Sequence, residues 1–136
     1  MSGGNTTVAR IEKARRAQAR WAKLSVDQRS KVLRSLRNEI ASQIDQIIGV
    51  ISEEIGKPPL DVLTGDIMVI LEQLRFYERN ADRLLRSHLV GKPWFFFTGT
   101  RFTESLEPHG VVLIFAPWNY PFQLAVVPMI TALFAG

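Results

Sequence analysis

The residue with the clearest chemical potential is Asn119, in the segment Pro-Trp-Asn-Tyr-Pro at residues 117–121. Its side-chain amide carries two N–H donors and no charge. Held firmly, such an amide stabilises an oxyanion as negative charge develops in acyl-type chemistry. The alternative is that Asn119 caps a helix opened by Pro121, and the local sequence taken alone favours this cap.

Two predicted elements flank that turn. Residues 111–115 are five consecutive apolar residues without polar alternation, which predicts a strand buried on both faces. Pro121 suits the first position of a helix that we expect to reach residue 134, with Pro128 kinking or restarting it. A buried strand that delivers a polar side chain to its C-terminal end is how open α/β sheets build ligand sites.

The first half of the chain has helical periodicity. One helix is predicted over residues 7–23, and Ser25 with Gln28 forms a capping box for a second. The apolar stripe of that second helix extends from residue 33 to residue 55, with a kink or break expected near Asn38.

Gly56 suits the C-terminal cap of the second helix, and a third is predicted over residues 60–86. Its stripe is nearly heptad, which favours packing against helices of the same protein over a coiled-coil partner. The stripe comprises Leu63, Ile67, Ile70, Leu74, Tyr77, Ala81 and Leu84.

The character of the sequence changes near residue 87. Aromatic and β-branched residues at 94–97 and 101–105 flank Thr-Gly-Thr, which predicts two short extended segments or a hairpin. We therefore divide the chain into a helical segment, 1–87, and a segment 88–136 with the extended region, the first buried strand and the following helix. Together they form one incomplete domain.

Composition limits the function classes. The apolar content of 46% and charged content of 22% are typical of a soluble globular protein, and no apolar run is long enough for a transmembrane helix. The absence of cysteine excludes disulfides and cysteine nucleophiles from this chain and fits a reducing, cytoplasmic location. Residues 10–37 are strongly basic, but the regular apolar stripe favours solvated helix faces over a nucleic-acid or anionic-membrane partner.

Searches for other sites are negative. The sequence has neither a Rossmann glycine fingerprint nor a P-loop, and no Gly-x-Ser-x-Gly motif. His88 and His109 are the only histidines and lack a second ligand at metal-binding spacing, so no metal site is expected.

Several segments together resemble the NAD(P)-dependent aldehyde dehydrogenase family, most closely the class 3 and fatty-aldehyde enzymes. The specific element is Pro-Trp-Asn-Tyr-Pro at 117–121. Supporting matches are Glu-Pro-His-Gly-Val-Val-Leu-Ile at 107–114, Ala-Leu-Phe-Ala-Gly at 132–136 and Glu-Ile-Gly-Lys-Pro at 54–58. The resemblance covers residues 8–136.

The resemblance implies an enzyme that oxidises a small-molecule aldehyde to a carboxylic acid with NAD or NADP. Asn119 would donate its amide to the oxyanion of a thiohemiacetal. The nicotinamide side of the cofactor groove would be lined by Phe115, Ala116, Pro117 and Trp118. The family also implies a homo-oligomer, in which residues 95–105 join a sheet that bridges subunits.

The family's cysteine nucleophile and glutamate base lie further along its sequence than this chain extends. We therefore expect an α/β protein consisting of the N-terminal helices and the start of a Rossmann-like cofactor domain, truncated and inactive alone. The alternative is a non-enzymatic helical interaction module that pairs with a full-length relative.

Overall fold

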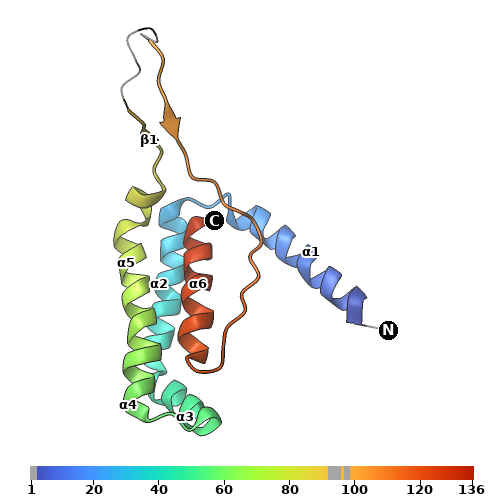
Figure 1. The fold of residues 1–136 in the computed structure, drawn as a ribbon, viewed down its shortest axis with the longest axis vertical. Coiled ribbons are helices and arrows are strands. Elements are labelled where there is room, and N and C mark those ends of the chain that lie inside the picture. The colour runs from blue at the N-terminus through green and yellow to red at the C-terminus, as the bar shows by residue number, and fades with distance from the viewer. Residues whose placement is uncertain (1–2, 92–95, 97–98) are drawn as a thin grey trace.

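The computed structural model describes residues 3–91, 96 and 99–136. In these ranges α2, α5 and α6 lie side by side, and α1 diverges from them (Figure 1). The elements in chain order are α1 (Gly3–Trp21), α2 (Val26–Ser42), α3 (Ile44–Ile55), α4 (Pro59–Asp61), the π-helical segment η1 (Val62–Ile67), α5 (Met68–Leu85), β1 (His88–Leu89), β2 (Thr103–Glu104) and α6 (Pro121–Ala135). No described helix is long and apolar enough to cross a membrane.

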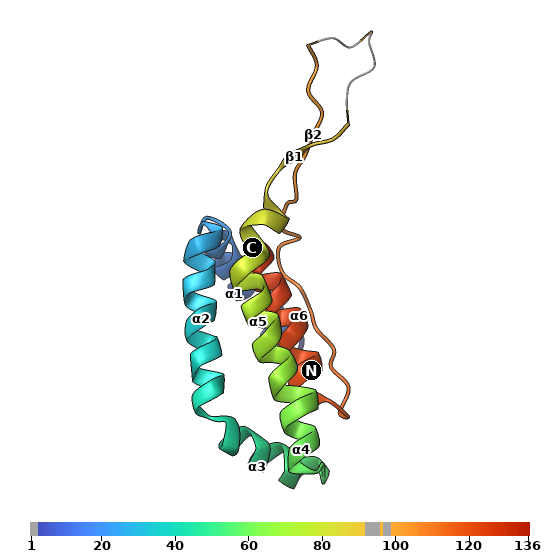
Figure 2. The same cartoon turned by 90° about the vertical axis from the view of Figure 1, so that its left-hand side faces the viewer.

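The capping signals act as predicted. The Ser25 hydroxyl accepts from the Gln28 N–H at 3.2 Å, and the Gln28 side chain accepts from the Ser25 N–H at 2.9 Å. Gly56 ends α3 in the left-handed region with φ 68°. The break between α2 and α3 lies at Gln43 rather than near Asn38, and it lets α3 turn away from the α2 axis toward α4 (Figure 2).

The core lies between α2, α5 and α6, with η1 and α3 closing one end. Packing of the third predicted helix against helices of the same chain is therefore confirmed, although Leu84 at the end of its stripe is 42% exposed. The buried apolar side chains are Leu33, Ile40, Ile51, Val62, Ile67, Ile70, Leu74, Ala81, Val126, Ile130 and Phe134. The helix at 121–134 is also confirmed, and it continues through Pro128 without restarting.

The prediction of a buried strand at 111–115 is wrong for this structure. These residues have no regular secondary structure, and Leu113 and Phe115 are 76% and 87% exposed. The segment runs alongside α6 in both views (Figures 1 and 2). A parallel strand needs at least one neighbouring strand to complete its hydrogen bonds, and the described residues form only the small β1–β2 sheet at the far end of the bundle. The Rossmann-like sheet is therefore not formed within the described residues.

The predicted hairpin is present, with its paired residues shifted outward. β1 and β2 are antiparallel, with His88 opposite Glu104 and Leu89 opposite Thr103. Of the predicted aromatic segment at 94–97, residues 94, 95 and 97 lie outside the described residues. The hairpin projects away from the helices (Figure 2).

Three polar side chains hold the C-terminal end of α6. Trp21 Nε1 donates to the Leu133 carbonyl and Arg29 Nη1 to the Phe134 carbonyl, both at 2.8 Å. Gln18 Nε2 donates to the terminal Gly136 carbonyl at 2.9 Å. These carbonyls have no partner within the helix, so the side chains satisfy them.

Arg29 is an exception to the predicted solvated basic faces. Most Lys and Arg side chains of residues 10–37 are exposed, but Arg29 is only 8% exposed. Burial lowers the pKa of its guanidinium below the ordinary value. Its hydrogen bond to α6 offsets part of that desolvation.

The Trp21 hydrogen bond leads to a first prediction. Trp21→Phe should lower the free energy of unfolding by about 1 kcal/mol, because the Leu133 carbonyl loses its donor. Urea unfolding followed by far-UV circular dichroism measures the change. Trp118→Phe is the matched control, since Trp118 is 77% exposed and its replacement should leave stability unchanged. Equal effects of the two substitutions would contradict this account of the α6 terminus.

Candidate functional site

The predicted site residues form one exposed stretch leading into α6. Phe115 and Trp118 are 87% and 77% exposed, and Ala116, Pro117 and Asn119 are also exposed. The Asn119 side chain forms no hydrogen bond with the described part of the chain. Its amide donors are therefore directed to solvent and available to a ligand.

The capping alternative for Asn119 is not what the structure shows. The N-cap of α6 is Tyr120, and no side chain of the cap residue bonds the first turn. Pro121 occupies the first turn, as predicted. The cap comes from a distant residue instead: Asp66 Oδ1 accepts from the Gln123 N–H at 3.0 Å. A carboxylate at this end also complements the helix dipole.

The Asp66 carboxylate belongs to an ion pair that reaches the Asn119 turn. Lys57 Nζ lies 2.6 Å from Asp66 Oδ2, and the two side chains are 11% and 0% exposed. The same ammonium donates to the Asn119 main-chain carbonyl at 3.3 Å. It also lies 3.5 Å from the centre of the Tyr120 ring, in cation–π geometry.

Local backbone features place both partners of this pair. Lys57 follows the left-handed Gly56 that ends α3, and Pro58 then begins the turn into α4. Asp66 lies in the π-helical turn η1, a feature often found at functional sites. Neither Lys57 nor Asp66 was predicted as a site residue from the sequence. The signal that could have pointed to Asp66 is the Gly65-Asp66 pair, which interrupts an otherwise regular helical stripe.

Gly65 makes room for Tyr120. A Cβ atom at Gly65 would lie 2.7 Å from Tyr120 Cε1, well inside van der Waals contact. The ring therefore lies directly on the η1 backbone while its face receives Lys57. The turn before α6 therefore packs against η1 through the Tyr120 ring. At this distance only a glycine at position 65 leaves room for the ring.

A second prediction tests this packing contact between Tyr120 and Gly65. Gly65→Ala should destabilise the protein by about 1–3 kcal/mol through overpacking, although alanine is the better helix former. In a Tyr120→Ala background the same substitution should be neutral or stabilising, because no ring opposes the methyl group. Gly49→Ala is the matched control: it lies in α3 with nothing within 4 Å of the added Cβ, so it should stabilise. Additive effects of Gly65→Ala and Tyr120→Ala in urea unfolding would argue against the contact.

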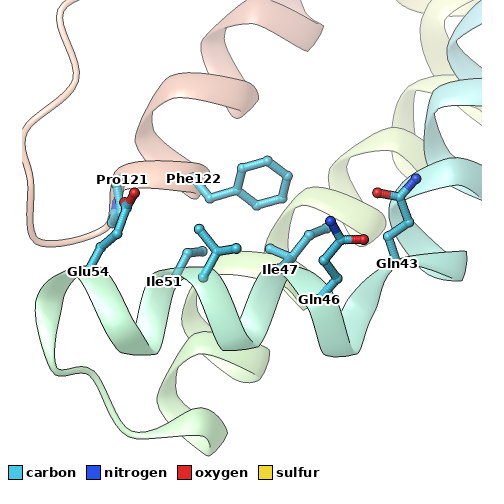
Figure 3. Close-up of a pocket in the computed structure, with 8 residues that line it drawn as sticks. Gln43, Gln46, Ile47, Ile51, Glu54, Pro121 and Phe122 are labelled. Atoms are coloured by element: carbon cyan, nitrogen blue, oxygen red, sulfur yellow. The ribbon is translucent and has the colours of Figure 1, made fainter.

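A separate hollow lies between α3 and the first turn of α6. It has a volume of about 330 Å³, and its lining includes Ile47, Ile51, Pro121 and Phe122. Figure 3 shows Phe122 directed toward the two isoleucines, with Gln43 at one rim. None of the predicted site residues lines this hollow, so it does not form part of the candidate site.

The exposed stretch has the chemistry of a surface for an aromatic or heteroaromatic ring, the class of group to which nicotinamide belongs. Phe115 and Trp118 offer flat aromatic surfaces, Ala116 and Pro117 add apolar area, and no charge intervenes. Such a surface packs against a heteroaromatic ring, and the Asn119 donors stand next to it. Within the described residues, no group of three or more His, Asp or Glu side chains is placed to hold a metal ion.

Comparison with known proteins identifies the family. Residues 2–136 match the family model described as the aldehyde dehydrogenase family. The chain is 36% identical over 126 residues to the 4,4'-diapolycopene aldehyde oxidase of a Methylomonas species, covering 93% of this chain and 24% of that protein. It is 30% identical over 108 residues to the 4,4'-diaponeurosporen-aldehyde dehydrogenase of Staphylococcus aureus, covering 79% and 23% respectively.

A solved structure gives the same result. The substrate-bound state of Staphylococcus aureus AldH matches with a TM-score of 0.77 and 28% sequence identity, over 82% of this chain and 24% of that one. The chain thus spans about a quarter of the length of the relatives that it matches. The family match and the structural match together confirm the resemblance seen in the sequence: this chain belongs to the aldehyde dehydrogenase family and corresponds to an N-terminal piece of its fold.

Proposed function

We propose that this chain forms the N-terminal part of an oxidoreductase that oxidises a small-molecule aldehyde to a carboxylic acid with NAD or NADP. The observation that carries the proposal is the Asn119 amide, which is exposed and uncommitted on a turn whose backbone is bound by Lys57. An amide in this setting is a ready oxyanion donor. Family membership favours this function over a non-enzymatic interaction module.

In the proposed reaction, Asn119 donates an N–H to the substrate oxygen as it becomes negatively charged. The aromatic and apolar surface of Phe115, Ala116, Pro117 and Trp118 would hold the nicotinamide side of the cofactor and would exclude water there. The cofactor, when bound, accepts a hydride. The amide is not itself a nucleophile, so the covalent step requires a cysteine from outside the 136 residues.

We further propose that the complete enzyme is a cytoplasmic homo-oligomer. The 136 residues contain no cysteine, which is consistent with a reducing compartment. The projecting β1–β2 hairpin exposes backbone edges of the kind that pair with another chain. The division of the chain at residues 87 and 88 stays a prediction.

A chimera tests the proposed function. Residues 1–136 replace the matching quarter of the Staphylococcus aureus enzyme whose structure aligns with this chain. The chimera should form NADH or NADPH on addition of an aldehyde, whereas the isolated 136-residue chain should not. Aldehyde oxidation by the isolated chain, or a correctly folded chimera without any turnover, would contradict the proposal.

A further inference from the structure

The Asn119 turn lacks the usual source of rigidity. Residues 115–119 are all exposed, and only the Tyr120 ring, which is 38% exposed, packs against another element, at Gly65 of η1. An oxyanion donor nevertheless requires a defined position, held within about 0.5 Å, to stabilise charge without reorganising. The order of Asn119 must therefore come from this ring and from polar contacts made by neighbouring elements.

Lys57 and Asp66 supply these contacts on both sides of Asn119. The Lys57 ammonium holds the Asn119 carbonyl at 3.3 Å and the face of Tyr120 at 3.5 Å. The Asp66 carboxylate holds the Gln123 N–H at 3.0 Å, in the first turn of α6. The 2.6 Å ion pair joins these two anchoring points into one unit.

Both residues of the ion pair are held by well-defined parts of the backbone. Asp66 is fully buried in η1, and Ile67 beside it is also fully buried in the core. Lys57 is confined between the left-handed Gly56 and Pro58. These contacts therefore fix the position of the exposed turn relative to the helical core.

We propose that Lys57 and Asp66 are positioning residues for Asn119: their buried ion pair fixes the turn backbone so that the amide is preorganised as an oxyanion donor. This inference rests on the proposed function for its catalytic consequence. The ordering of the turn is measurable without any turnover.

The test is nuclear magnetic resonance relaxation of the 136-residue chain, labelled with ¹⁵N at asparagine only. The sequence has four asparagines, so Asn38 and Asn80 serve as internal references in α2 and α5. In the unmodified chain the backbone order parameter of Asn119 should lie near the rigid value of about 0.85. In the Lys57→Met/Asp66→Asn double variant it should fall below about 0.6, while both references stay unchanged.

The double variant removes both charges together, so that neither is left buried without a partner. The matched control is Arg37→Met/Glu78→Gln. It removes a second, partly buried ion pair, at 2.8 Å between α2 and α5, far from the turn in sequence. The control should leave the Asn119 order parameter unchanged.

A second variant keeps the test decisive if the double variant does not fold. Tyr120→Leu leaves the ion pair intact and removes the ring beneath the ammonium. It should lower the Asn119 order parameter by a smaller amount. An Asn119 that is mobile in the unmodified chain, or rigid in both variants, would overturn the proposal.

The catalytic consequence is measured separately in the chimera. Lys57→Met/Asp66→Asn should reduce kcat at least tenfold and leave the KM for the nicotinamide cofactor unchanged. A loosened turn in a chimera that shows no Asn119-dependent turnover would support the positioning role and contradict the proposed function. A loosened turn with unchanged kcat would overturn the link between positioning and catalysis.

Discussion

Asn119→Ala in the chimera is expected to lower kcat about 100- to 1,000-fold, the usual effect of removing one oxyanion donor. The KM for NAD or NADP should change little, because the proposed cofactor surface is formed by the preceding residues 115–118. The loss should be confined to kcat, since the amide bonds an oxygen whose charge develops only in the transition state. Steady-state kinetics with aldehyde and cofactor varied in turn separate these effects.

Two further variants serve as comparisons for Asn119→Ala. Asn119→Asp has the same shape but replaces the donors with a negative charge, so it should lose at least as much activity as alanine. Asn38→Ala removes an exposed asparagine from α2 and should leave kcat unchanged. Retention of more than about a third of the activity in Asn119→Ala would exclude an oxyanion role of the expected size.

Local signals predicted the helical part of the fold well. The Ser25 capping box, the left-handed Gly56 and the start of α6 at Pro121 all depend on residues a few positions apart. The information needed to form such features is contained in the segment itself. The stripe of the third helix likewise identified its buried face, since helical period follows from sequence spacing.

The strand at 111–115 illustrates the opposite case. A run of apolar residues indicates that its side chains tend to be buried. It does not identify the elements that would cover them. In the described residues no strand lies beside this run, so it forms no regular secondary structure, and four of its five side chains are exposed. A strand in a parallel sheet depends on distant residues in a way that a helix does not.

The contacts that Lys57 and Asp66 make around Asn119 could not be predicted from the sequence either. Lys57 and the Asn119 carbonyl are 62 positions apart in sequence, and Asp66 and the Gln123 N–H are 57 apart. The sequence predicts Gly56 as the C-terminal cap of the second helix, a role that it does have. Only the three-dimensional arrangement shows that Lys57, the next residue, places its ammonium against the Asn119 turn.

The ion pair leads to the second large prediction. Asp66→Ala should lower the free energy of unfolding by about 3–5 kcal/mol, because it leaves a largely buried ammonium without its partner and the Gln123 N–H without its acceptor. The effect should lie toward the lower end of that range, since Lys57 keeps 11% exposure and retains the Tyr120 ring. Urea unfolding midpoints of the 136-residue chain, with the slope compared between variants, measure the change.

Two comparisons separate the lost partner from the lost side chain. Lys57→Met/Asp66→Ala leaves no unpaired charge, so it should recover much of the stability lost by Asp66→Ala alone. Asp27→Ala breaks the exposed Lys31–Asp27 pair, whose side chains are 68% and 73% exposed, and should cost less than about 1 kcal/mol. If the double variant were as unstable as Asp66→Ala, the carboxylate would be acting mainly as the cap of α6, and the interaction with Lys57 would contribute little. Recovery in the double variant would instead establish that the buried charges depend on each other, as their 2.6 Å contact implies.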